Sequence, residues 1–362
     1  MFSFFAKQKP ALGLDISDSS LRMMELVAEG SGLFPHAYAE QPLPKGVVAE
    51  GEIKNAAKVS ELIERAWRHP NAGRFTTPYV ALSVPESKSF VRVISVMRMS
   101  AEEAATAVPL EAEQYVPISA DQAYLDFRIL PENNESSDKM KVLITAAPRS
   151  LVESYVTVIK GGGLKPAAVE VESEAVARCL IEQQSEPTLI TDISTTRTSL
   201  IIYDQQSLQF TSSIPVAGNA FTSQIAQTFT LSFEEAEKLK LQSGLDSRRD
   251  QGKLRESLQS QLRSLSDAIR NAINFYREHS EGSRLVTRIL LTGGGSRIRG
   301  LEQYLAQEIG AIGGKVLSVT IGDPWVNVLG KPLKRVPPIP KGTSVSFSTA
   351  IGLALRGVEL SM

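Results

Sequence analysis

Cysteine is nearly absent from this chain of 362 residues, which contains Cys179 and no other. A single thiol can form neither an internal disulfide nor a cage of thiolate metal ligands, so disulfide scaffolds and cysteine-based metal folds are excluded. Cys179 lies in an apolar helical stretch with Ala175, Val176 and Leu180, which predicts a buried and unreactive thiol. The composition therefore fits a reducing compartment.

The chain also lacks an excess of charge and a long apolar run. Its 39 Lys and Arg nearly balance its 40 Asp and Glu, giving a net charge of −1, so no overall field favours nucleic acid or an anionic membrane. No stretch approaches the roughly 20 apolar residues that span a bilayer. The start, MFSFFAKQKP, places its apolar residues before its basic ones, unlike a signal peptide, and favours a mobile terminus over a membrane or partner contact.

An internal repeat is the most informative feature that is present. Residues 12–28, LGLDISDSSLRMMELVA, resemble residues 189–204, LITDISTTRTSLIIYD. Each copy is an apolar strand that ends in Asp-Ile-Ser, a hydroxyl-rich turn and a second strand, and a third strand-like run follows each (FPHAYAE; LQFTSSIPV). The pattern predicts a three-stranded meander at the start of each half, with Asp15 and Asp192 about half a chain apart. Two such halves predict two related α/β lobes that face each other.

The segment between the two copies predicts an inserted subdomain over about residues 85–165. A helix at 50–69 and the strands of YVALSVPESKSFVRVISVM precede a capping box from Ser100 to Glu103. The runs YLDFRIL and MKVLITAAP, joined by PENNESSDK, predict a hairpin with a long loop, and a helix follows at about 150–160.

The second half predicts mostly helices around one further strand. Ser232 and Glu235 form a second capping box, and the polar stretch SGLDSRRDQGK precedes a long helix. The apolar residues of that helix recur at spacings of three and four: Leu254, Leu258, Leu262, Leu265, Ile269 and Ile273. A strand (RILLTGGGS), a helix (GLEQYLAQEIG), a loop (KPLKRVPPIPKG) and a final helix with Ala350 and Ala354 on one face complete the chain.

Four short segments could bind a ligand. The turns after Asp15 and Asp192 can point backbone amides and hydroxyls into one concavity that suits phosphate oxygens, and the two aspartates could hold Mg²⁺ through water. The triplet Gly293, Gly294 and Gly295 allows close backbone approach to a flat ligand. Glu237 and Lys240 share a helix face, and taken alone they predict a solvated ion pair.

The order of these segments resembles the actin and FtsA superfamily. DISDSS is similar to its phosphate-1 motif, DISTTRT to phosphate-2, GGGSRIRG to the adenosine motif, and VEVESEAVAR, with Glu172, to the first connecting segment. Within the superfamily, LEAEQYVPISADQAYLDF, IPVAGNAFTSQIAQTFTLSFEEAEKLK and LLTGGGSRIRGLEQYLAQEIG resemble the PilM family of type IV pilus assembly. The resemblance runs from about Leu12 to Gly357.

The resemblance implies an actin-like ATPase fold, in which two RNase H-like lobes enclose a nucleotide cleft, with an FtsA-type inserted 1C subdomain. The implied limits are 10–84 and 169–187 for subdomain 1A, 85–168 for 1C, 188–220 and 285–343 for 2A, 221–284 for 2B, and 344–362 for a closing helix that packs on 1A.

The resemblance also implies ATP and Mg²⁺ as ligands, with Asp15 and Asp192 facing the metal. The residues implied to bind nucleotide are Asp15, Ser17, Asp18, Ser19, Ser20, Asp192, Ser194, Thr195, Thr196, Gly218, Asn219, Glu237, Lys240, Gly293, Gly294, Gly295 and Arg297. Ser17 and Ser194 depart from the family, which usually has glycine at both positions, and their β-carbons hinder the approach of phosphate to the backbone. The resemblance therefore supports nucleotide binding less strongly than for a typical member, and hydrolysis is a further step. No residue of either turn is identified as a catalytic base.

The implied partner is the cytoplasmic N-terminal peptide of PilN, bound in a groove between 1A and 1C. PilO and PilP are implied indirectly, as are the pilus motor ATPases and self-association, and the expected location is the cytoplasm, at the inner membrane only through partners. One alternative is an FtsA-like polymerising protein, although the chain ends at RGVELSM without an amphipathic targeting helix. Another is a sugar-kinase-like phosphotransferase, which needs a base that the sequence does not reveal. A GspL-type secretion protein would need a membrane span.

Overall fold

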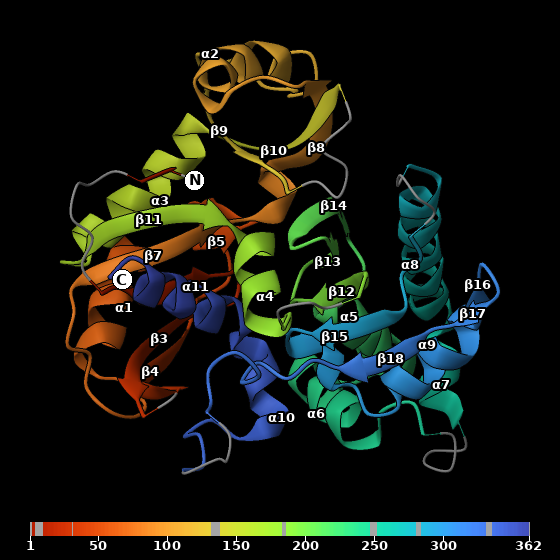
Figure 1. Cartoon of the computed structure of the whole chain (residues 1–362). Helices are drawn as coiled ribbons and strands as arrows, with labels where there is room; N and C mark the ends of the chain where they lie inside the picture. Colours follow the sequence, from red (N-terminus) through yellow and green to blue (C-terminus); the bar gives the residue numbers. More distant parts are fainter. Residues whose placement is uncertain are drawn as a thin grey trace.

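The protein forms two α/β lobes side by side, with a smaller sheet above them (Figure 1). The structure is a computed structural model of the chain. It describes residues 2–3, 10–30, 32–131, 138–182, 186–246, 252–279, 284–330 and 335–361. Parts of three predicted loops lie outside these residues, at 132–137, 247–251 and 331–334. No helix within the described ranges is both long and apolar enough to cross a bilayer.

A six-stranded mixed sheet forms the first lobe, in the order β1-β11-β7-β2-β3-β4. Its strands are β1 (Phe2–Ser3), β2 (Leu12–Ile16), β3 (Ser20–Glu29), β4 (Gly32–Pro42), β7 (Tyr79–Val84) and β11 (Lys165–Val171). Strands β2, β3 and β4 are successive antiparallel neighbours, whereas β2, β7 and β11 run parallel. The first predicted meander is therefore confirmed.

A five-stranded sheet repeats this arrangement in the second lobe, in the order β14-β13-β12-β15-β18. Its strands are β12 (Thr188–Ile193), β13 (Thr198–Asp204), β14 (Ser207–Ile214), β15 (Arg288–Thr292) and β18 (Ser318–Ile321). As in the first lobe, three strands form an antiparallel meander, a fourth strand pairs in parallel with the first strand of the meander, and a fifth pairs in parallel with the fourth. The second meander is confirmed, and the repeat extends to the parallel strands.

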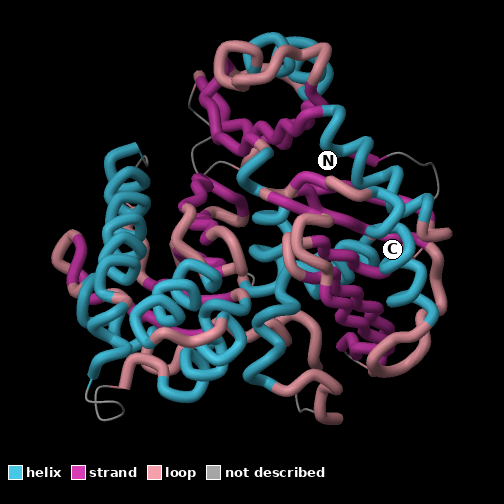
Figure 2. The backbone as a smooth tube through the Cα atoms, turned by 180° about the vertical axis from the view of Figure 1, so that it is seen from behind, coloured by secondary structure: helices cyan, strands magenta, loops and turns pink. Residues whose placement is uncertain are grey.

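A three-stranded antiparallel sheet stands above the lobes, as the view from behind also shows (Figure 2). It contains β8 (Phe90–Met97), β9 (Ala123–Ile129) and β10 (Lys139–Pro148), and α2 (Ala101–Ala112) covers one face. The capping box of Ser100 and Glu103 is present at the start of α2. The domain limits given above remain predictions. Helix α3 (Arg149–Gly161) lies within the segment predicted as 1C, yet it packs on α1 (Ala56–Arg68), and β11 begins in that segment, yet it lies in the first-lobe sheet.

Helices of the second half cover the second-lobe sheet. They are α5 (Gly218–Phe229), α6 (Phe233–Ser243), α7 (Lys253–Ser257), α8 (Gln259–His279) and α9 (Leu301–Ile309). The capping box of Ser232 and Glu235 is confirmed. The prediction of one continuous helix from Leu254 was wrong, because Leu258 leaves the helical conformation at ψ 0°. The hydrogen bonds from Leu258 N to Leu254 O and from Leu262 N to Leu258 O still align α7 with α8.

Short elements complete the chain. These are β5 (Val48–Ala49), β6 (Glu52–Ile53), β16 (Ala311–Ile312), β17 (Lys315–Val316), α4 (Glu172–Leu180), α10 (Lys341–Ser344), α11 (Ser348–Glu359) and the 3₁₀ turns η1 (Glu86–Lys88), η3 (Gly294–Arg297) and η4 (Val345–Phe347). Phe2–Ser3 pairs with Val169 and Ala168 on β11, which differs from the mobile terminus that we expected. Cys179 is buried as predicted, and burial raises the pKa of its thiol.

Close packing of α11 holds the centre of the molecule together. The helix lies against β2 and α4, and Ala350 and Ala354 are fully buried, as their spacing predicted. A β-carbon added at Gly352 would lie 1.8 Å from the backbone oxygen of Ala175, and one at Gly13 would lie 2.2 Å from that of Ala350. Glycine is therefore required where these backbones meet.

We expect Gly352→Ala to lower the free energy of unfolding. Helix propensity alone would raise it by about 1 kcal/mol, but the added methyl group must displace backbone, and overpacking costs about 1–3 kcal/mol. Urea unfolding followed by circular dichroism measures the sign. A more stable variant would contradict the close approach of α11 to α4.

Candidate functional site

The two repeated turns meet at a cleft between the lobes. Asp15 lies near the end of β2 and Asp192 near the end of β12, and each is 6% exposed. The cavity between the turns has a volume of about 60 Å³, and its lining includes Glu86 and Glu172. Pockets that hold drug-sized ligands have about 300–1,000 Å³. The cavity is therefore smaller than a ligand of that size needs.

Hydrogen bonds within the first turn fix its shape. The backbone N–H and the hydroxyl of Ser17 both donate to Ser20 O, each at 2.9 Å. The carboxylate of Asp18 accepts from the backbone N–H groups of Glu50 and Gly51, at 3.2 and 2.9 Å. Neither Ser17 nor Ser194 is among the described non-glycine residues that have a positive φ. Serine in place of glycine therefore costs no backbone strain here, and its β-carbon is the remaining difference.

The two turns also bind each other directly. The hydroxyls of Ser19 and Thr195 lie 2.8 Å apart, and the hydroxyl of Thr196 donates to Asp18 Oδ2 at 2.9 Å. These hydroxyls and the Asp18 carboxylate lie on the two facing turns. A phosphate group that entered between the turns would replace these contacts with its own hydrogen bonds.

Burial dominates the electrostatics of the cleft. Desolvation raises the pKa of Asp15 to about 6, against the attraction of Arg22. Desolvation and the charge of Asp15 raise the pKa of Asp192 to about 7. Desolvation and both aspartates hold the pKa of Glu172 well above its usual range. The guanidinium of Arg22 lies 3.9 Å from Asp15 Oδ2. The cleft therefore favours a cation or protons on its carboxyl groups.

The donor set of the cleft suits Mg²⁺, which prefers oxygen ligands and keeps several waters. Asp15 and Asp192 supply carboxylates from the two lobes. Within the part of the chain that the structure describes, no three His, Cys, Asp or Glu side chains are close enough to hold a metal by themselves. A metal here would need water or phosphate oxygens as further ligands.

The glycine triplet packs against the second turn. Gly293 has φ +79°, and an added β-carbon would lie 2.2 Å from Asp192 Oδ1. At Gly295 it would lie 2.3 Å from Ile193 Cγ2, whereas at Gly294 the nearest atom is Ser346 Oγ at 3.6 Å. Packing on β12 thus explains two of the glycines, and Gly294 leaves room beside the backbone. Arg297 lines a different cavity, with Arg255 and Tyr304.

Helices α5 and α6 support the second turn from the other side. The backbone N–H groups of Gly218 and Asn219 donate to Ser194 O and Thr195 O at 3.0 and 2.8 Å. Lys240 is 3% exposed, and its ammonium donates to Gly218 O at 3.1 Å and pairs with Glu237 at 2.6 Å. The solvated ion pair predicted from the spacing was therefore wrong for Lys240, because the α5 backbone covers it. Lys240 fixes α5 under the turn.

Two acidic residues of the cleft had no predicted role. Glu172 follows β11, and Glu86 follows β7 through Pro85. Glu86 is 6% exposed, and its Oε2 atom has no hydrogen-bond partner. Ligands of open α/β sheets bind beyond the carboxyl ends of the strands, and all four acidic residues stand at or just beyond such ends. An acidic residue at each strand end was the signal that could have identified them.

Comparison with known proteins gives the site its family context. Residues 13–358 match the sequence profile of the family described as type IV pilus assembly protein PilM. A solved structure described as a PilM-PilN type IV pilus biogenesis complex is 27% identical, with a TM-score of 0.80, over 97% of this chain and 99% of that chain.

More distant structures share the fold. MreB 5 of Spiroplasma citri, bound to AMPPNP, is 13% identical with a TM-score of 0.56, over 99% of this chain and 100% of that chain. The ethanolamine utilization protein EutJ from Carboxydothermus hydrogenoformans is 14% identical with a TM-score of 0.55, over 95% and 89%. The chain therefore has the actin-like ATPase fold, built on two mixed α/β sheets.

The raised pKa values of the cleft predict how stability changes with pH. A carboxyl group whose pKa is higher in the folded chain binds more protons there, so the free energy of unfolding falls as pH rises from about 4 to about 7. Asp192→Asn removes one such group. We expect it to raise the melting temperature at pH 8 and to flatten the profile between pH 4 and 7.

Melting temperatures at several pH values in that range, without divalent cations, measure the effect. Asp121→Asn, at an exposed aspartate, is the matched control and should leave the profile unchanged. A steeper decline for Asp192→Asn than for the unaltered chain would contradict the electrostatics of the cleft.

Proposed function

The chain belongs to the type IV pilus assembly protein PilM family, and on that premise we propose that it is a cytoplasmic, ATP-binding scaffold of pilus assembly. In this proposal it binds the N-terminal peptide of PilN and joins the inner-membrane complex to the pilus motors. The observation that supports nucleotide binding is the pair of Asp-containing turns. One turn follows β2 and the other follows β12, and these two strands hold equivalent positions in sheets of matching topology.

Each residue of the cleft receives a role in this proposal. Asp15 and Asp192 hold Mg²⁺ through water, and the metal neutralises phosphate charge when it is bound. The turns 17–20 and 194–196 donate hydroxyl and amide hydrogen bonds to phosphate oxygens. The adenosine lies beside the backbone of Gly293 to Gly295, and Arg297 lies on the far side of that turn. Lys240, with Glu237, holds Gly218 and the start of α5 under the second turn, in place of the contact with the ribose or base that the resemblance implies.

Hydrolysis is a second candidate activity, which the position of Glu172 favours. Its carboxyl group lines the cleft with both aspartates. As a carboxylate it could accept a hydrogen bond from a water and orient it. Its raised pKa disfavours the charged form until a cation enters. Slow turnover at most is therefore expected, and a phosphotransferase or an FtsA-like polymerising protein remains an alternative without a supporting observation.

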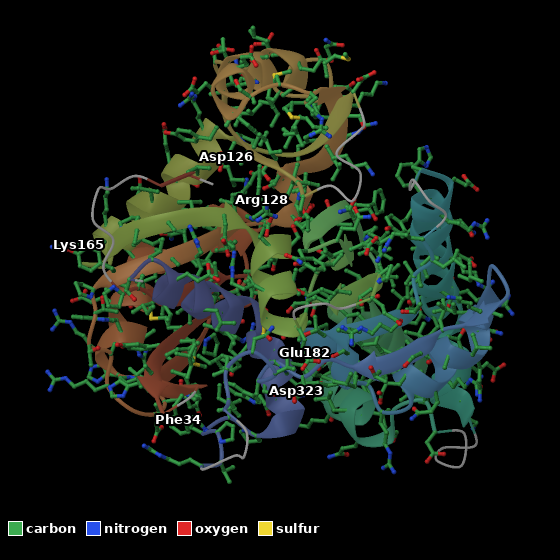
Figure 3. All side chains as sticks on the ribbon, viewed as in Figure 1. Phe34, Asp126, Arg128, Lys165, Glu182 and Asp323 are labelled. Atoms are coloured by element: carbon green, nitrogen blue, oxygen red, sulfur yellow. The ribbon has the colours of Figure 1, made fainter. Side chains whose placement is uncertain are left out.

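A groove between the inserted sheet and the first lobe suits the PilN peptide. It has a volume of about 260 Å³, and it is lined from β9 and β10 on one side and from β11 and α4 on the other. Figure 3 labels Asp126 and Arg128 of β9 at this junction. Arg128 pairs with Glu174 at 3.1 Å, and Val169 and Thr145 supply apolar and hydroxyl-bearing walls. The similar structure is described as a complex of PilM with PilN.

We expect Asp192→Ala to weaken Mg-ATP binding by at least about tenfold, because a metal-facing carboxylate is lost. Isothermal titration calorimetry with Mg-ATP measures it, and Asp121→Ala serves as the control at an exposed aspartate. Binding of the PilN peptide by the same variant should not change. Equal ATP affinity in both variants would mean that the turn is misassigned.

We expect Thr145→Trp to reduce binding of the PilN N-terminal peptide by at least about tenfold, since the indole would fill the groove. Thr157→Trp, on an exposed position of α3, is the matched control. Calorimetric titration with the peptide compares them, and retained Mg-ATP binding shows that the variant is folded. Undiminished peptide binding would place PilN elsewhere.

A further inference from the structure

A short hairpin of the first lobe reaches the cleft beside the first turn. Strands β5 and β6 are antiparallel, and Glu50 and Gly51 join them as a two-residue turn. Both residues line the cavity of the cleft, together with Asp18 and Thr196. The proposed function assigns the phosphate contacts to the two repeated turns, so the hairpin has no role in it.

Both residues of the hairpin turn have a positive φ, which is +50° at Glu50 and +74° at Gly51. Glycine adopts this conformation freely, whereas it costs another residue roughly 1–2 kcal/mol. Turns of this kind commonly have Asn or Asp before the glycine, and the side chain of Glu50 is exposed. Residues keep such a conformation where their surroundings impose it, often at ligand-binding positions. The backbone contacts of the turn should therefore show what the conformation serves.

Two contacts fix the hairpin on the side away from the first turn. The hydroxyl of Tyr155, which is fully buried, donates to Gly51 O at 2.9 Å. A β-carbon added at Gly51 would lie 2.6 Å from Cγ of Pro85, the residue that follows β7. The hairpin turn is therefore held against α3 and the end of β7, whatever its N–H groups bind.

The two N–H groups of the hairpin turn bind a negative charge. Gly51 N donates to Asp18 Oδ1 at 2.9 Å, and Glu50 N donates to Asp18 Oδ2 at 3.2 Å. The hydroxyl of Thr196, on the second lobe, donates to the same Oδ2 at 2.9 Å. Successive N–H groups of this kind form a concavity that binds anions. Asp18 therefore occupies an anion site at the cleft, built by donors from both lobes.

A phosphate group can replace the Asp18 carboxylate on these donors. Both groups present oxygens that accept charge-assisted hydrogen bonds from backbone N–H groups. Asp18 is half-buried, so its side chain can turn toward water. The two N–H groups stay in place, because Tyr155 and Pro85 hold the hairpin. Backbone donors that lose their partners inside a protein cost free energy, so the vacated site favours another oxyanion.

We propose that the N–H groups of Glu50 and Gly51, with the hydroxyl of Thr196, form a phosphate subsite that Asp18 fills until a phosphate group displaces it. The inference rests on the proposed function, which supplies the phosphate as part of ATP. It also gives Asp18 a different role from the nucleotide contact that the resemblance implies, because the carboxylate competes with phosphate. Removal of this carboxylate should therefore tighten nucleotide binding, although it takes three hydrogen bonds from the folded chain.

Calorimetric titration of the full chain with Mg-AMPPNP tests the competition. We expect Asp18→Ala to bind at least about tenfold more tightly than the unaltered chain, since the subsite no longer has to be vacated first. In urea without nucleotide, the same variant should have a lower free energy of unfolding, because hydrogen bonds are lost. Asp18→Asn keeps one acceptor oxygen and should gain less affinity. Tighter binding by a less stable chain is not expected of an aspartate that binds the metal or only supports its turn.

Two control variants assign the gain to the subsite. Glu52→Ala removes a carboxylate from the same hairpin, where it pairs with Lys54 and Lys88. Ser19→Ala removes the other contact between the repeated turns while Asp18 stays in place. Neither variant should bind Mg-AMPPNP more tightly than the unaltered chain. Unchanged or weaker binding by Asp18→Ala, or an equal gain in either control, would overturn the subsite and leave the proposed function standing.

Inorganic phosphate with Mg²⁺ separates the subsite from the nucleotide. Phosphate that binds the folded chain raises its melting temperature, and we expect a larger rise for Asp18→Ala than for the unaltered chain. If neither chain binds Mg-AMPPNP, the proposal of nucleotide binding fails, and the phosphate result alone decides the subsite. An equal rise in both chains, or no rise in either, would then overturn the subsite as well.

Discussion

Two buried aspartates that face each other across the lobes are the constraint on which this structure depends. Asp15 and Asp192 end strands of two separate sheets, and burial makes their negative charges costly to hold. The surrounding structure fixes them nonetheless: the Gly293 turn packs on Asp192, Arg22 approaches Asp15, and Lys240 anchors the helix beneath the second turn. A cleft built around such charges favours a bound cation, and the proposed function assigns it Mg²⁺ together with the phosphate groups of ATP.

The repeat and its consequences could be predicted from the sequence because they depend on local signals. Alternating strands, Asp-Ile-Ser turns and the two capping boxes each extend over a few residues, and the structure confirms the meanders and both boxes. Long-range burial could not be predicted in the same way. The i, i+3 spacing of Glu237 and Lys240 is typical of a solvated pair, but the α5 backbone covers the lysine. Glu86 and Glu172 enter the cleft only because β7, which pairs with β2, and β11, which pairs with β7, end at the same edge of the sheet.

The serines at 17 and 194 take on a different meaning in three dimensions. Glycine would be required if either turn needed a positive φ, and neither serine has one. Ser17 instead closes its turn by donating to Ser20 O, while Ser19 and Thr195 join the two turns. The departure from glycine thus leaves the turns intact, and in the proposed function a nucleotide enters only when the hydrogen bonds between the two turns are broken. The inserted sheet has grooves toward both lobes, and the proposed function assigns the one toward the first lobe to the PilN peptide.

A crystal structure of the full chain with AMPPNP and Mg²⁺ tests the central claim most directly. The account predicts phosphate oxygens between the turns at 17–20 and 194–196, the metal facing Asp15 and Asp192, and the contact between Ser19 and Thr195 broken. A nucleotide bound elsewhere, such as in the cavity beside Arg297, with the two turns still hydrogen-bonded to each other, would contradict it.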